Sequence, residues 1–138
     1  MPTTTEVERL VIQRVGQDVF REALERYWLG KCAVTGVADR ALLRASHILP
    51  WSQCESDNQR LDVFNGILLV AHLDAAFDAF LMSFDEKGLP LLSPRLSTEA
   101  AKFLDDSLKG QAIPFADRHQ GYLQYHRMRF LALGKESA

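Results

Sequence analysis

Two short strand-like segments followed at once by a helical segment constrain the fold of this chain most. Residues 42–49 alternate in the manner of a strand, and Pro50 ends the segment. A polar loop follows, and an apolar segment at residues 67–70 has the character of a second, buried strand. Residues 72–81 then show helical spacing of apolar side chains. The order strand, loop, strand, helix predicts a small α+β unit.

The length of 138 residues is that of one ordinary domain with a single core. We expect a single domain over residues 1–138, with helices over residues 1–30 that divide at Gly16. The strand–loop–strand–helix core is expected at 40–82, and further strands and a helix at 83–138. No separate recognition domain fits within this length.

The composition excludes two classes of protein. No apolar run approaches the roughly 18 residues that a membrane helix needs, and no N-terminal signal pattern is present, so we expect a cytoplasmic protein with no membrane partner. The formal net charge of −2 argues against a generic basic nucleic-acid coat. Acidic residues are concentrated in the middle of the chain, where a bound cation would offset them; the charge alone favours a solvated acidic surface.

The two cysteines, Cys32 and Cys54, are expected to be free thiols in a reducing compartment. Cys32 begins the segment Cys-Ala-Val-Thr, which lacks the second thiol of a zinc hairpin. We therefore expect no structural zinc.

Four polar residues lie on the strand–loop–strand–helix unit. His47 is in the first strand, Asn65 enters the second, and Asp74 and Asp78 are in the helix. Residues four apart share one face of a helix, so both carboxylates project to the same side. Two like charges at this spacing cost roughly 0.2–0.5 kcal/mol in an isolated helix, whereas a divalent cation converts them into oxygen ligands. Taken singly, a histidine in a strand is more often a packing residue, and a pair of Asp residues on a helix is usually solvated.

Three ordered motifs give these residues a context. They are SHILPW at residues 46–51, NGILL at residues 65–69 and LDAAFD at residues 73–78. Together they resemble the HNH endonucleases, and more specifically a bacterial restriction-endonuclease-like branch. The resemblance extends from about residue 16 to residue 127. It implies a ββα-metal nuclease core with N-terminal and C-terminal helices packed around it.

The resemblance assigns a role to each polar residue of the motifs. It makes His47 the general base of phosphodiester hydrolysis, a task suited to an imidazole. Asn65 matches the middle residue of the family pattern, which holds the catalytic loop in place or helps to bind metal. Asp74 and Asp78 match metal-ligand positions. His72 is the alternative ligand, because sequence does not fix the start of the helix within two to four residues.

The resemblance also implies one divalent metal ion and DNA as substrate. Mg²⁺ or Mn²⁺ suits a shell of carboxylate and amide oxygens, and Zn²⁺ or Ni²⁺ suits a shell richer in histidine. The products would carry 5′-phosphate and 3′-hydroxyl ends.

Arg44, Arg60 and Arg127 are the candidate DNA contacts. For Arg44 and Arg60, surface salt bridges are an equal alternative to phosphate contacts, and for Arg127 packing is the favoured alternative. No second element for reading bases is evident, so sequence specificity would need a homodimer or a separate specificity partner.

Three functional hypotheses follow. The first is a metal-dependent DNA endonuclease of restriction or phage defence. The second is a catalytically weak HNH-fold module that binds nucleic acid or a partner protein. It rests on Ser46, which stands where the family often has Asp, and on Asp74, which stands where the family often has His. The third is a structural α/β protein in which the motifs are coincidental.

Overall fold

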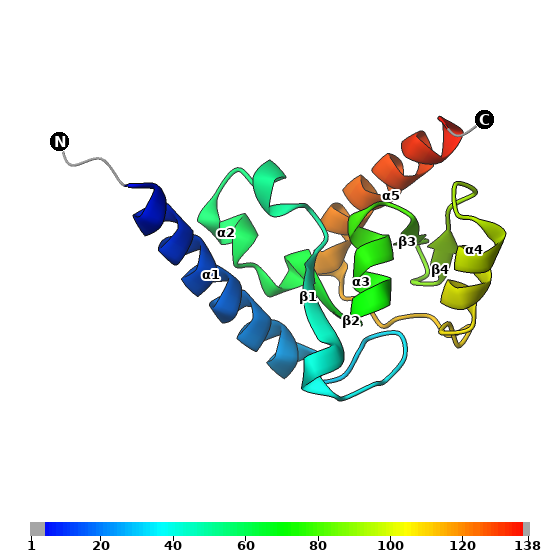
Figure 1. Cartoon of the computed structure of the whole chain (residues 1–138), viewed down its shortest axis with the longest axis horizontal. Helices are drawn as coiled ribbons and strands as arrows, with labels where there is room; N and C mark the ends of the chain where they lie inside the picture. The colour runs from blue at the N-terminus through cyan, green and yellow to red at the C-terminus, as the bar shows by residue number, and fades with distance from the viewer. Residues whose placement is uncertain (1–4, 137–138) are drawn as a thin grey trace.

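The structure is a computed structural model that describes residues 5–136, and its architecture is α+β, as the sequence predicts (Figure 1). The α-helices are α1 (Glu6–Tyr27), α2 (Asp57–Arg60), α3 (Ala71–Asp78), α4 (Thr98–Asp105) and α5 (Gln120–Lys135). The strands are β1 (Leu43–His47), β2 (Gly66–Val70), β3 (Met82–Phe84) and β4 (Pro90–Leu92). Single turns of 3₁₀ helix occupy Arg40–Leu42, Trp51–Gln53, Val63–Asn65 and Asp117–His119.

The central unit is an antiparallel pair, β1 and β2, followed directly by α3. Its register pairs Leu43 with Val70 and His47 with Gly66. β1 is three residues shorter than the strand predicted at residues 42–49. Residue 42 belongs to the preceding 3₁₀ turn, and the pairing with β2 ends at His47 and Gly66. β2 is buried along its whole length, which explains its continuous apolar sequence.

Helices α1 and α3 cover opposite faces of this pair. Neighbouring strand residues point to opposite faces: His47 stacks on Phe20 of α1, whereas Ser46 contacts Asp74 of α3. Glycine at residue 66 permits the approach of α1. A Cβ atom there would overlap the Phe20 ring and lie 2.9 Å from a methyl carbon of Leu24.

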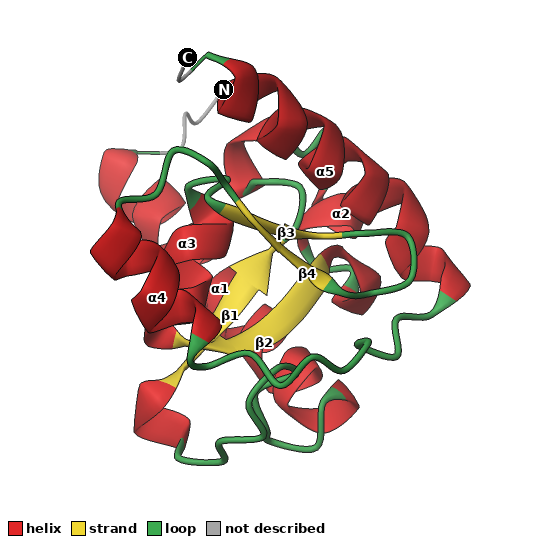
Figure 2. Ribbon diagram, turned by 90° about the vertical axis from the view of Figure 1, so that its right-hand side faces the viewer, coloured by secondary structure: helices red, strands yellow, loops and turns green. Residues whose placement is uncertain are grey.

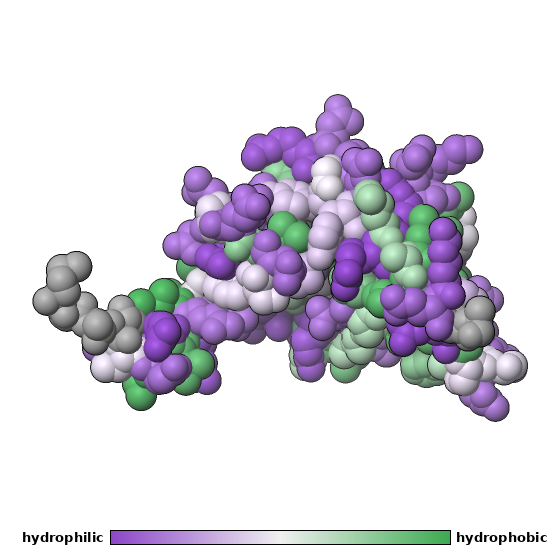
Figure 3. Space-filling view, turned by 90° about the horizontal axis from the view of Figure 1, so that it is seen from above, coloured by the Kyte–Doolittle hydropathy of each residue, from purple (hydrophilic) through white to green (hydrophobic). Residues whose placement is uncertain are grey.

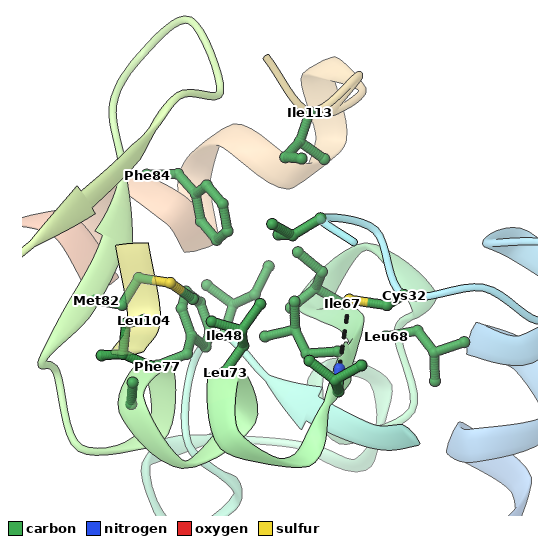
Figure 4. Close-up of a cluster of buried hydrophobic side chains, with 14 of the residues drawn as sticks. Cys32, Ile48, Ile67, Leu68, Leu73, Phe77, Met82, Phe84, Leu104 and Ile113 are labelled. Atoms are coloured by element: carbon green, nitrogen blue, oxygen red, sulfur yellow. Dashed lines mark hydrogen bonds between the residues drawn. The ribbon is translucent and has the colours of Figure 1, made fainter. Parts of the chain in front are cut away.

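The core lies between the β1–β2 pair, α3 and the β3–β4 hairpin (Figure 4). Ile67, Leu73, Phe77 and Phe84 are fully buried there. Cys32 also belongs to this cluster. Its sulfur accepts a hydrogen bond from the backbone N–H of Val70 at 3.3 Å, drawn as the dashed line in Figure 4. Both cysteines are buried and free.

The N-terminal region is one helix, not the divided pair predicted at residues 1–30. Gly16 lies inside α1, where glycine costs roughly 1 kcal/mol relative to alanine but does not stop a helix. A Cβ there would lie 3.2 Å from the Trp51 ring, so the glycine allows close packing. The first half of α1 extends past the body, and its apolar side chains, such as Val7 at 70% exposure, remain uncovered (Figure 3).

The C-terminal part supplies the second hairpin, β3–β4, and the helices α4 and α5 (Figure 2). His126 of α5 is buried and joins this part to the core. Its Nε2 donates to the carbonyl of Phe77, and its Nδ1 accepts from the Ser83 hydroxyl, both at 2.8 Å. Within residues 5–136, no helix has the length and apolar character needed to cross a bilayer.

Candidate active site

His47 lies at the end of β1 with its ring fixed on three sides. It stacks on Phe20 with centroids 3.8 Å apart and meets Trp51 edge to face at 5.6 Å. Nε2 lies 2.7 Å from the carbonyl oxygen of Arg60. A carbonyl only accepts, so Nε2 carries the proton, and Nδ1 of the neutral ring keeps the lone pair. Burial lowers the pKa of His47 below its usual range, against the opposing effects of the Arg60 carbonyl and the Asp78 charge.

Asn65 is fully buried and ties together both ends of the loop between β1 and β2. Its Oδ1 accepts the N–H of Leu49 at 2.7 Å, and its Nδ2 donates to the carbonyls of Leu49 and Gln59 at 3.3 and 3.1 Å. Gln59 directly precedes Arg60, whose carbonyl orients His47. The amide is thus engaged within the loop, which favours the loop-holding role over the metal-binding one.

Asp74 and Asp78 lie on one side of α3, as their spacing predicts, and each is electrostatically coupled to the strand. The Ser46 hydroxyl donates a short hydrogen bond to Asp74 Oδ1. Burial raises the pKa of Asp74; the Ser46 bond and Arg44 act against this rise, and Asp78 adds to it. Asp78 is exposed at the end of the helix, close enough to His47 for its charge to raise the histidine pKa.

His72 is placed elsewhere. Its Nε2 lies 2.8 Å from the hydroxyl of Ser107, and its ring lies 5.0 Å from the ring of Phe103 on α4. Residues two apart on a helix point to nearly opposite sides, so His72 and Asp74 do not face one ion. The structure thus favours the carboxylates over the alternative ligand.

A cluster of three or more His, Cys, Asp or Glu side chains suited to a metal ion is absent from residues 5–136. Asp74 and Asp78 alone offer carboxylate oxygens on this side of α3. Mg²⁺ is commonly bound in this way, through one or two carboxylates, with water and substrate phosphate as the other ligands.

A pocket of about 260 Å³ lies against His47, between β1 and α1. Its lining residues are Gln17, Asp18, Phe20, Arg21, Ala45 and His47. Arg21 donates to the carbonyl of Arg40 at 2.8 Å, and its buried Nε lies 3.8 Å from the Glu25 carboxylate. The sequence predicts no site residue in this helix. The available signal was that Gln17 and Arg21 are one helical turn apart, beside the buried Phe20.

The three predicted DNA contacts have different surroundings. Arg44 is exposed and lies close enough to Asp74 to lower its pKa. Arg60 is occupied inside the loop, where it donates to the carbonyls of Trp51 and Cys54. It also pairs with the Asp57 carboxylate, so its donors are not free for phosphate.

Arg127 lies in α5, away from Arg44 and Arg60. It donates to the carbonyl of Phe84 at 2.9 Å and lines a surface pocket beside the β3–β4 turn. This placement agrees with the packing alternative rather than with a DNA contact.

Comparison with known proteins agrees with this arrangement. A family model described as HNH endonuclease matches residues 32–85, which include β1, the loop, β2, α3 and β3. No curated protein matches the chain. The match contains His47, Asn65, Asp74 and Asp78 within one strand–loop–strand–helix unit. We therefore assign residues 32–85 of this chain to the HNH endonuclease family.

Proposed function

We propose that this chain is a metal-dependent endonuclease that hydrolyses DNA phosphodiester bonds, with His47 as general base. The observation that carries the proposal is the bond from His47 Nε2 to the Arg60 carbonyl. This bond fixes the tautomer in which Nδ1 accepts a proton. It occurs within a ββα unit of the HNH endonuclease family.

His47 accepts the proton of the attacking water. A base must be unprotonated to act, and burial lowers the pKa of His47, so the ring is neutral at pH 7. Phe20 and Trp51 restrict rotation of the ring, which keeps Nδ1 in one direction. Asn65 acts as a positioning residue through the loop carbonyls.

Asp74 and Asp78 are the residues that we propose to hold the divalent cation. Their oxygens fit Mg²⁺ or Mn²⁺ better than Zn²⁺ or Ni²⁺, which favour nitrogen ligands. When bound, such a cation polarises the scissile phosphate and stabilises the charge of the leaving oxygen.

Arg21 and Arg44 are the cations that we propose to contact the phosphates next to the scissile bond. Arg21 lines the pocket against His47, donates to the carbonyl of Arg40 and lies 3.8 Å from the Glu25 carboxylate. Arg44 is exposed on β1 and close to Asp74, and its Nη1 donates to the carbonyls of Ala41 and Leu43. Arg21 shares a pocket with His47 and Arg44 acts on the charge of Asp74, whereas Arg127 is bound to the carbonyl of Phe84.

We further propose that the nuclease acts in restriction or phage defence. The support for this role is the resemblance of the three sequence motifs to restriction-endonuclease-like HNH proteins.

The second candidate is an HNH-fold module that binds nucleic acid without efficient cleavage. The Ser46–Asp74 hydrogen bond favours it, because Ser46 occupies one of the Asp74 oxygens that a cation would use. The two candidates differ in one observable: the module retains DNA binding but gives no metal-dependent products.

The test is incubation of the purified chain with supercoiled plasmid in Mg²⁺, in Mn²⁺ and in chelator. We expect nicked and linear DNA only with metal, with ends that ligase rejoins, as 5′-phosphate and 3′-hydroxyl ends require. DNA binding with no product in either metal would contradict the endonuclease proposal and support the binding module.

A further inference from the structure

Two arginines outside the site described above have unused donors. The guanidinium of Arg118 lies 4.4 Å from the ring centroid of Phe64, and that of Arg129 lies 5.6 Å from the ring centroid of Phe80. Neither has a hydrogen-bond or ion-pair partner among residues 5–136. Aromatic contact holds each charge in place and leaves its N–H groups available.

Arg129 lies within α5, and Arg118 lies in the 3₁₀ turn Asp117–His119 that leads into this helix. Residues 118, 122, 125 and 129 follow helical spacing, so Tyr122 and Tyr125 lie between them. The Tyr122 hydroxyl donates to Asp62 at 2.9 Å. The Tyr125 hydroxyl has no such partner within the described chain, and its half-buried ring lies in the groove described next.

The face of α5 forms one wall of a groove, and the loop between β1 and β2 forms the other. Two pockets of about 320 and 250 Å³ make up the groove and share Tyr125. The loop contributes Leu49 and Pro50, which follow His47 almost directly. It also contributes the amides of Gln53 and Gln59 and the hydroxyl of Ser52. Among the described residues that line the two pockets, none is acidic.

We propose that this groove, which we call the α5 groove, binds the nucleic-acid strand that leads away from His47. Guanidinium groups bind phosphates, and tyrosine rings between them offer a surface on which bases stack. Carboxylates, which repel phosphates, are missing from the lining. The inference rests on the proposed endonuclease function, and it adds the substrate contacts beyond the scissile bond.

The length of the groove indicates how much nucleic acid it holds. Eleven residues separate Arg118 from Arg129, a rise of roughly 16 Å. Stacked nucleotides rise 3.4 Å per strand, so this length corresponds to about five nucleotides. The α5 groove therefore favours substrates that extend several nucleotides to one side of the cleaved bond.

The test measures binding apart from cleavage. A fluorescent oligonucleotide is titrated with the full chain carrying His47→Ala, in chelator, at several salt concentrations. In this background, Arg118→Gln with Arg129→Gln removes two phosphate contacts and lowers the salt slope of log affinity by about 1.4 to 1.8. The ratio of parent affinity to variant affinity is therefore about 25- to 60-fold larger at 0.1 M salt than at 1 M salt.

The matched control is Arg26→Gln with Arg95→Gln, which makes the same change in net charge at two exposed arginines away from the groove. We expect its binding and salt slope to stay near those of the parent. If Arg118→Gln weakens the fold through loss of the Phe64 contact, Arg129→Gln alone tests the proposal, with a slope change of about 0.7 to 0.9.

Two outcomes separate this inference from the proposed function. Equal affinity and equal salt slope for the two double variants would overturn the α5 groove, even if the wild-type chain cleaves DNA. Selective loss of binding in Arg118→Gln with Arg129→Gln supports the groove, even if the wild-type chain yields no metal-dependent product.

Discussion

Replacement of Asn65 by alanine tests whether one buried amide organises the loop that orients His47. The variant loses the two best-formed side-chain bonds, to Leu49 N–H at 2.7 Å and to the Gln59 carbonyl at 3.1 Å. Each bond contributes about 1 kcal/mol net, and the stranded partner groups cost about 1 kcal/mol more in total. We expect the free energy of unfolding to fall by about 3 kcal/mol, which leaves a domain of ordinary stability folded.

The same change acts on catalysis. The Gln59–Arg60 backbone is released, and a displacement of about 1 Å in a catalytic group costs roughly 100-fold in rate. Urea unfolding gives the stability, and plasmid nicking below the unfolding transition gives the rate. Asn58→Ala is the control, because Asn58 is an exposed asparagine in the same loop. Wild-type stability and cleavage in Asn65→Ala would refute the reasoning.

Three further perturbations probe the fold and the proposed metal ligands. Gly66→Ala forces a Cβ into Phe20, so we expect a loss of about 1–3 kcal/mol in urea unfolding; a gain in stability would show that α1 is not seated against β2. The pKa of His126 falls to about 4 through burial, whereas the unfolded chain takes up that proton near pH 6.5. The free energy of unfolding therefore has its full value above pH 6.5 and declines by about 3 kcal/mol as the pH falls to 4. Thermal melts across this pH range would detect the decline. Asp74→Ala lowers Mn²⁺ affinity in calorimetric titration while His72→Ala leaves it unchanged; the reverse order would transfer the ligand role to His72.

The ββα unit was predictable because each of its elements has its own sequence signal. Alternation marks β1, the apolar run marks the buried β2, and the spacing of Asp74 and Asp78 places both on one side of α3. The position of Asn65 at the entry to β2 was likewise evident from the Asn-Gly turn signal. These signals are local, so they can be read from the sequence without knowledge of tertiary contacts.

Properties that depend on tertiary contacts were not predictable. Sequence alone does not tell whether an arginine donates inward, as Arg60 does, or lies free over an aromatic ring, as Arg118 does. Gly16 has the sequence signal of a helix stop, yet its role is close approach to Trp51. The pocket between α1 and His47 arises from packing of segments nearly thirty residues apart.

Cleavage by His47→Ala, with and without added imidazole, tests the central claim most directly. Loss of the general base lowers the rate by about 10²- to 10⁴-fold, and imidazole that enters the pocket against α1 restores part of it. His72→Ala, measured in parallel, keeps the wild-type rate, because His72 faces α4. A folded His47→Ala chain that cleaves plasmid at the wild-type rate without imidazole would contradict the account.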